Sequence, residues 1–204
     1  MSNKINILCI VKAHFNTLKD ISKKGISKLD ITTFIIMPIS LSLFSAYKNF
    51  NLNKDLDSLL LLVNFGAIFT ALLLSVIVLI YDQENRTIEK VRNNADSVGE
   101  VSQNKLLLLK ELYHNISYAI LCSLALVVLT FIHSTLPPVT PEIIENSRVF
   151  IDYKIRGFSI NFSFTFTWAT TIISPLIIFV TANIVLTIVM IVKRLYLILI
   201  NNTN

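Results

Sequence analysis

Charged residues are scarce in this chain, and long stretches contain none. Only 15% of the 204 residues are Asp, Glu, Lys or Arg, whereas 53% are hydrophobic and the mean hydropathy is +0.66. This composition is too apolar for an ordinary soluble domain of this length. A soluble all-α protein with buried core helices is the alternative, and we expect a membrane protein.

Four stretches lack all four charged residue types: 31–47, 59–81, 115–132 and 168–192. Each is close to the roughly 20 residues that a helix needs to cross a hydrocarbon core of about 30 Å. Backbone polar groups in lipid have to be satisfied within the segment, so we expect helices rather than open strands. The sequence therefore predicts an all-α membrane protein with four transmembrane helices.

The absence of charge within the four stretches also excludes several functions. Proton relays, voltage sensors and ion-coupled transporters depend on ionisable residues inside their spans. No inverted repeat is visible either, and such repeats are common in secondary transporters. We therefore do not expect a transporter.

Residue types that carry out chemistry are few and scattered. The two cysteines, Cys9 and Cys122, do not have the spacing of a metal site, and the three histidines, His14, His114 and His133, are far apart in the sequence. No HExxH, GxSxG or phosphate-cradling loop occurs. We expect no enzyme activity, no metal and no cofactor.

The distribution of Lys and Arg predicts the orientation. The N-terminal segment, the loop after the second stretch and the C-terminus together hold 13 of them, and the two remaining loops hold 5. Positive residues stay in the cytoplasm, so both termini and residues 82–114 are expected there, in a bacterial inner membrane. This rule accounts for the net charge of +5, and we expect no direct binding of nucleic acid.

The predicted organisation has six parts. They are a basic amphipathic cytoplasmic arm (1–30), the first two spans (31–81), a cytoplasmic helical hairpin (82–114), the third span (115–133), an extracytoplasmic loop with a β-hairpin (134–167), and the fourth span with a cytoplasmic tail (168–204). The first arm places Leu8, Val11, Phe15 and Leu18 at helical spacing, which suits a helix lying on the membrane surface. Packing of this helix on the rest of the protein is the alternative.

The predicted cytoplasmic hairpin has a narrow apolar seam. Asn93 and Asn94 mark its expected break, and the seam consists of Ile88, Val91, Ala95 and Val98. Such a hairpin buries little by itself, so Ile88, Val91 and Val98 are expected to bind a second copy of the chain or a soluble partner.

The segment SRVFIDYKIRGFSINFSFTFTW, residues 147–168, alternates apolar and polar residues. If Arg156 and Gly157 form a two-residue turn, paired residues have numbers that sum to 313, and one face is entirely apolar. A slip of one residue would mix the two faces, which favours this single register for a β-hairpin. Since an isolated hairpin is marginally stable, its apolar face is expected to rest on the spans, the lipid or other subunits; that face includes Tyr153, Phe158, Phe162 and Phe164.

Two asparagines lie within the charge-free stretches. Asn64 and Asn183 are expected to hold contacts within the bundle or between subunits, because an amide in lipid seeks a hydrogen-bond partner. The alternative is that Asn183, with Thr181 and Thr187, lines a pore.

The order and length of these segments resemble the KwaA family, the four-span membrane subunits of the bacterial Kiwa antiphage system. The resemblance covers the whole chain and is carried by the layout, notably ENRTIEKVRNNADSVGEVSQNKLLLLKELYH and the segment 147–168. It implies a homo-oligomeric sensor or scaffold of the inner membrane with a soluble cytoplasmic partner, KwaB. The alternative function is a pore-forming effector that depolarises the membrane.

Overall fold

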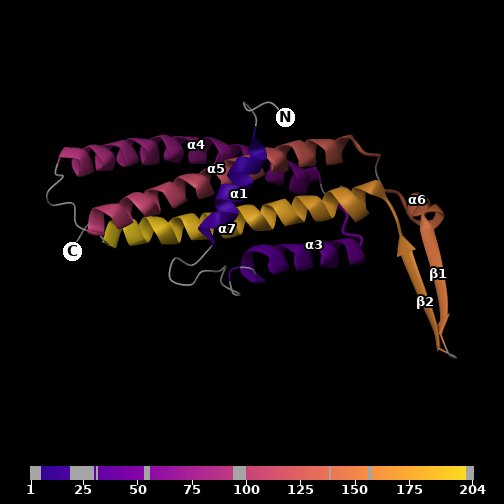
Figure 1. The fold of residues 1–204 in the computed structure, drawn as a ribbon. Coiled ribbons are helices and arrows are strands. Elements are labelled where there is room, and N and C mark those ends of the chain that lie inside the picture. Colours follow the sequence, from indigo (N-terminus) through magenta and orange to yellow (C-terminus); the bar gives the residue numbers. More distant parts are fainter. Residues whose placement is uncertain are drawn as a thin grey trace.

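The computed structural model describes residues 6–18, 30, 32–52, 56–93, 100–137, 139–155 and 158–200. Most of this part of the chain belongs to three long helices: α4 (Leu56–Asn93), α5 (Glu100–Thr135) and α7 (Ser174–Ile200), the last preceded by the π-helical segment η3 (Trp168–Ile173). They lie side by side, with α5 in contact with both α4 and α7 (Figure 1).

The three long helices are long and apolar enough to cross a membrane. Their apolar spans are Asp57–Glu89, Lys105–Thr135 and Trp168–Ile198, of 33, 31 and 31 residues. At about 1.5 Å per residue, each exceeds a hydrocarbon core of about 30 Å. They contain the second, third and fourth charge-free stretches, and they indicate a membrane protein.

The first charge-free stretch forms a shorter apolar helix. It consists of η1 (Thr32–Ile36), a π-helix, and α3 (Met37–Tyr47), and it is not among the helices long enough to span. Pro38 lies just after the junction of η1 and α3, where the helix changes from π to α geometry. α3 runs beside α7 (Figure 1).

The core forms along α5, whose side chains are the most fully buried. Leu112, Ile116, Ala119 and Leu126 have no exposed surface. One apolar cluster joins α4, α5 and α7 towards the end of the bundle where α4 ends and α5 begins. Its buried residues are Leu73, Ile80, Leu109, Leu112, Ile116, Ala119, Ile191 and Ile198. A second cluster lies towards the other end and contains Leu52, Leu59, Leu126, Ile177 and Ile184.

Helices α4 and α5 approach closely at Gly66. A Cβ atom at this position would lie 2.8 Å from Cγ2 of Val127 and 3.1 Å from the backbone oxygen of Ser123. The contact therefore depends on the missing side chain of Gly66. Small residues at helix contacts are typical of membrane bundles, because close packing there replaces the hydrophobic effect.

Helices α4 and α5 extend well beyond their charge-free stretches. α4 continues from Tyr81 to Asn93, and α5 begins at Glu100, before the stretch that starts at Asn115. We call residues 82–93 and 100–114 the charged arms. The connection between them, which includes Asn94, Ala95, Ser97 and Val98, lies outside the described residues.

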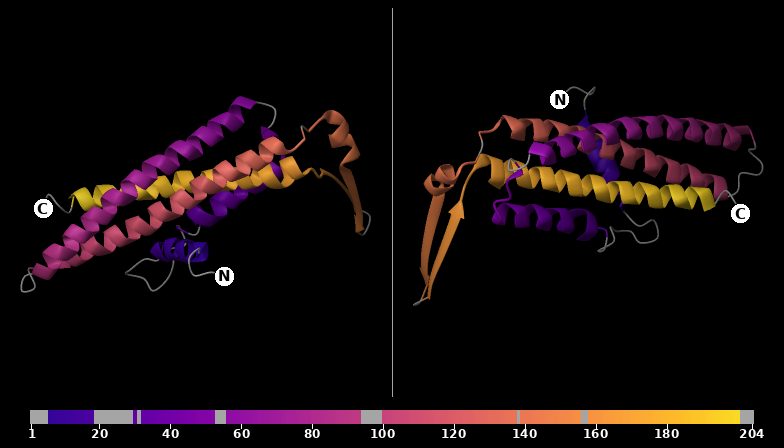
Figure 2. Two further views of the ribbon diagram at one scale, coloured as in Figure 1. Left: turned by 90° about the horizontal axis from the view of Figure 1, so that it is seen from above. Right: turned by 180° about the vertical axis from the view of Figure 1, so that it is seen from behind.

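The first helix, α1 (Ile7–Thr17), lies across α5 and α7 rather than alongside them (Figure 1). Asn6 caps it, since Oδ1 of Asn6 accepts a hydrogen bond from the backbone N–H of Cys9 at 3.2 Å. The two further views place α1 on the outside of the bundle (Figure 2). The N-terminal helix is thus packed on the protein at the face that bears His14 and Thr17.

The end of the bundle opposite the charged arms carries a short helix and two strands. α6 (Pro141–Asn146) is followed by β1 (Arg148–Ile155) and β2 (Phe158–Thr165), which pair antiparallel. Ile151 lies opposite Phe162, and Asp152 lies opposite Asn161, as the alternation in the sequence predicts. Both figures show the strands leaning away from the helices (Figures 1 and 2).

Candidate functional site

A polar centre lies where α1 crosses α5, around the side chain of Asn115. Nδ1 of His14 is 2.9 Å from Oδ1 of Asn115, and Oγ1 of Thr17 is 2.9 Å from the same oxygen. The hydroxyl of Thr17 also lies 2.7 Å from the backbone oxygen of His14. One residue of α5 therefore holds two side chains of α1.

His14 is buried and packed as well as hydrogen-bonded. Its ring stacks on that of Tyr118, one turn further along α5, with centroids 3.9 Å apart and planes at 6°. Burial lowers the pKa of His14 to about 4. The hydrogen bond with Asn115 opposes this shift, and the repulsion from Arg194 adds to it. The imidazole is therefore neutral at pH 7.

Arg194 joins the third helix to this centre. Its Nη2 donates to the backbone oxygen of Thr17 at 2.9 Å and lies 3.2 Å from Oε2 of Glu111. The carbonyl of Thr17 is at the end of α1, so a cation there also compensates the negative end of the helix dipole. Residues of α1, α5 and α7 thus form one polar network, and we call it the inner polar centre.

None of the residues of the inner polar centre was among those predicted from the sequence as site residues. Thr17 lies about 100 positions before Asn115 and about 180 positions before Arg194. No spacing rule connects such distant positions. The available signal was a histidine on a helix predicted to be amphipathic. That histidine is His14, and its burial results from tertiary packing, which no local pattern encodes.

The opposite end of α5 carries a second buried contact. Nε2 of His133 lies 3.0 Å from Oγ of Ser174 at the start of α7, and both residues are buried. Asn183 is also buried, but its amide donates to the carbonyl of Phe179 in its own helix at 3.0 Å. Asn64 is exposed on α4.

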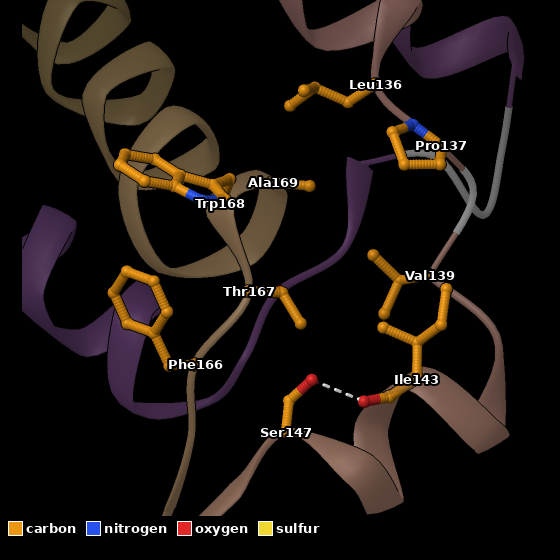
Figure 3. Close-up of a pocket in the computed structure, with 9 residues that line it drawn as sticks. All are labelled: Leu136, Pro137, Val139, Ile143, Ser147, Phe166, Thr167, Trp168 and Ala169. Carbon is orange, nitrogen blue, oxygen red and sulfur yellow. Dashed lines mark hydrogen bonds between the residues drawn. The ribbon is translucent and has the colours of Figure 1, made fainter.

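A small apolar cavity lies beside this end of the bundle. It has a volume of about 220 Å³ and lies between the end of α5, helix α6 and the start of η3. In Figure 3, Val139 and Ile143 face Thr167 and Ala169 across it, while the rings of Phe166 and Trp168 stand to one side. The cavity therefore lies between the base of the two strands and the helical bundle.

Phe166 and Trp168 form an aromatic pair at the point where β2 leads into η3. Their rings meet edge to face at 5.8 Å and 73°, and Trp168 is 65% exposed. Exposed Trp at the end of an apolar span is typical of the membrane–water interface. This position fits the boundary predicted by the start of the charge-free stretch at residue 168.

The residues predicted for the two hairpins are described to different extents. Ile88 is exposed on α4, whereas the side chain of Val91 and all of Val98 lie outside the described residues. Tyr153, Phe158, Phe162 and Phe164 are placed through their backbone pairing. The arm of α5 does not stand alone, because Leu109 and Leu112 pack with Ile198 at the end of α7.

The part of the chain that the structure describes contains no group of three or more His, Cys, Asp or Glu residues that could hold a metal ion. No family model, no curated protein and no solved structure matches the chain.

Proposed function

We propose that this chain is the subunit of a homo-oligomeric sensor or scaffold in a bacterial inner membrane. It has four spans with both termini in the cytoplasm, and it couples the outer strands to a soluble cytoplasmic partner. This is the role that the resemblance to the KwaA family implies. The partner, KwaB in that family, would bind at the charged arms.

The first span of this proposal, which is added to the three long helices, is the segment from η1 to α3. Thr33 and Phe34 line a cavity with Arg194, at the inner end of α7. Leu43 and Ala46 line another with Thr171 at the outer end. The segment therefore follows α7 between the two levels, which supports a crossing although its 16 residues are short for a core of about 30 Å.

The position of α1 supports the orientation of the N-terminus. It contacts Asn115, at the start of the charge-free stretch 115–132, and Arg194, just after the stretch 168–192. Both contacts lie at the end of the bundle that carries the charged arms. The N-terminal segment and the arms then lie on one side of the membrane. The 13 to 5 distribution of Lys and Arg assigns that side to the cytoplasm.

The continuity of α5 is the observation that carries the proposal. One helix of 36 residues runs from the charged arm at Glu100 to Thr135, close to α6 and β1. β2 leads back within two residues into η3 and α7. Both strands are therefore attached through short links to helices that reach the charged arms, so a displacement of the strands would be transmitted along these helices.

Substitutions in the outer strands test whether these strands take part in sensing. Phe162 lies opposite Ile151 on the apolar face of the register, and Asn161 lies opposite Asp152 on the polar face. In cells that express the chain with its partner, we expect Phe162→Asp to abolish protection against phage and Asn161→Asp to retain it. Equal protection by both variants, at equal amounts in the membrane, would contradict a role of the strands in sensing.

The alternative, a pore, finds less support along α7. Thr181, Asn183 and Thr187 each donate to a backbone carbonyl of their own helix, at 2.8, 3.0 and 2.7 Å. Asn183 and Thr187 are also buried within the chain. Ion flux through liposomes that contain the purified protein would distinguish the two functions, since a sensor or scaffold leaves the membrane impermeable.

A further inference from the structure

A second cavity lies at the inner end of the bundle, beside the inner polar centre. Its volume is about 400 Å³, within the range of small-ligand sites. The end of α1, η1, the arm of α5 and the last turns of α7 surround it. It is thus formed by four segments that are far apart in the sequence.

The walls of this cavity carry charges of both signs. Lys193 and Arg194 come from α7, Glu111 comes from α5, and Asp30 precedes η1. Arg194 and Glu111 are only 12% and 21% exposed. Nη1 of Arg194 is buried and has no hydrogen-bond partner among the residues that the structure describes. Buried donors are nearly always satisfied, and the described part of the chain offers this N–H group no acceptor, so a ligand in the cavity beside it could supply one.

The depth of the cavity limits what that acceptor can be. Lys193 directly follows the last residue of the charge-free stretch 168–192, and Glu111 precedes the start of the stretch 115–132. These positions correspond to the level of the lipid headgroups. From the cavity, Leu186 and Val189 continue along α7 towards the membrane centre, and Val189 is 62% exposed. An apolar track therefore leads from the charged site into the lipid.

We propose that the cavity binds the headgroup of a phospholipid that carries both a phosphate and a primary ammonium, namely phosphatidylethanolamine. Nη1 of Arg194 and the ammonium of Lys193 hold the phosphate, Asp30 and Glu111 hold the ethanolamine ammonium, and one acyl chain follows Leu186 and Val189. A lipid in this position contacts α1, η1, α5 and α7 together.

The pair of carboxylates decides between headgroups. An anionic headgroup such as phosphatidylglycerol would place its phosphate near Asp30 and Glu111 and add no cation to the one that Arg194 already provides. The trimethylammonium of phosphatidylcholine has no N–H to donate to a carboxylate. Of these three headgroups, ethanolamine alone offers both a phosphate and an N–H-bearing cation, and hydrogen bonds that involve a charged group are about twice as strong as neutral ones.

The test measures lipid binding to the full-length protein in detergent by native mass spectrometry, with phosphatidylethanolamine, phosphatidylcholine and phosphatidylglycerol of equal chain length. We expect the ethanolamine lipid to bind best. Lys193→Ala should weaken its binding about tenfold, because Lys193 contributes a charge-assisted hydrogen bond to the phosphate. Lys193 is exposed and is not one of the residues that hold α1, so the substitution should leave the docking of α1 intact. Arg86→Gln, which removes an exposed cation from the arm of α4, is the matched control and should bind as the unchanged chain does.

Asp30→Asn tests the ammonium half of the site separately. It should abolish the preference for the ethanolamine over the choline lipid while retaining binding. Equal binding of the three lipids by the unchanged chain, or equal binding by Lys193→Ala and Arg86→Gln, would overturn the proposal. Binding of soluble phosphorylethanolamine as tight as that of the lipid would also overturn it, because the site would then serve a soluble ligand.

Discussion

At the scale of single residues, two polar side chains of α5 hold the neighbouring segments in place. Asn115 holds His14 and Thr17 of α1, and His133 holds Ser174 at the start of α7. All five are buried, where a polar group without a partner destabilises the fold. These contacts join specific turns of α1 and α7 to α5.

The contact of Asn115 predicts how α1 is released. Asn115→Leu leaves His14 and Thr17 without their shared acceptor, which should weaken the docking of α1 by about 1–3 kcal/mol. A spin label on Cys9, which is exposed on α1, should then become more mobile. Ser117→Ala is the control, because Ser117 donates only to the carbonyl of Tyr113 in its own helix. Unchanged mobility in Asn115→Leu would show that α1 docks by other contacts.

The lowered pKa of His14 predicts a dependence on pH. Its value of about 4 when docked lies below the ordinary 6.5, so the released helix binds the proton more readily. The docking free energy should therefore be fully present above pH 6.5 and should decrease as the pH falls towards 4, by on the order of 3 kcal/mol. Tyr118 and Arg194 face the imidazole from α5 and α7, and Arg194 repels its charged form.

The same spin label measures this effect. We expect its mobility to rise between pH 7 and pH 5 in the unchanged chain. In His14→Gln, which keeps a hydrogen-bonding side chain that does not titrate, the rise should be absent. A rise of equal size in both proteins would assign the pH dependence to another group.

At the scale of helices, close packing of α4 on α5 joins the two charged arms. The two helices meet at Gly66 in the membrane and continue side by side towards Asn93 and Glu100. A hydrophobic effect between helices is absent in lipid, so their alignment depends on the fit of their surfaces. Gly66 is the position at which this fit is tightest.

Gly66→Ala should therefore destabilise the bundle. The added Cβ would lie 2.8 Å from the side chain of Val127 and 3.1 Å from the backbone of Ser123, and the backbone cannot give way as a side chain can. We expect a loss of about 1–3 kcal/mol, measured as a lower Tm in detergent. Ala67→Leu is the control, because Ala67 is the next residue of the same helix and its side chain is exposed. Equal Tm values would contradict the close contact.

At the scale of the whole molecule, the sequence predicted the elements better than their contacts. The long apolar helices and the strand register follow from local patterns: runs without charge, and an alternation that only one register satisfies. The crossing of α1 over α5 brings His14 to Asn115, more than 100 residues away, and no periodicity encodes it. Asn183 has its partner in its own helix because the carbonyl of Phe179 lies one turn away.

The central claim is that the outer strands and the charged arms lie on opposite sides of one membrane. Single cysteines at Glu145 on α6 and at Arg86 on α4, both exposed, can be labelled in intact cells after Cys9 and Cys122 are replaced by serine and alanine. A membrane-impermeant maleimide should label the cysteine at 145 and should reach the one at 86 only after the inner membrane is opened. Labelling of both positions, or of position 86 alone, in intact cells would contradict the account.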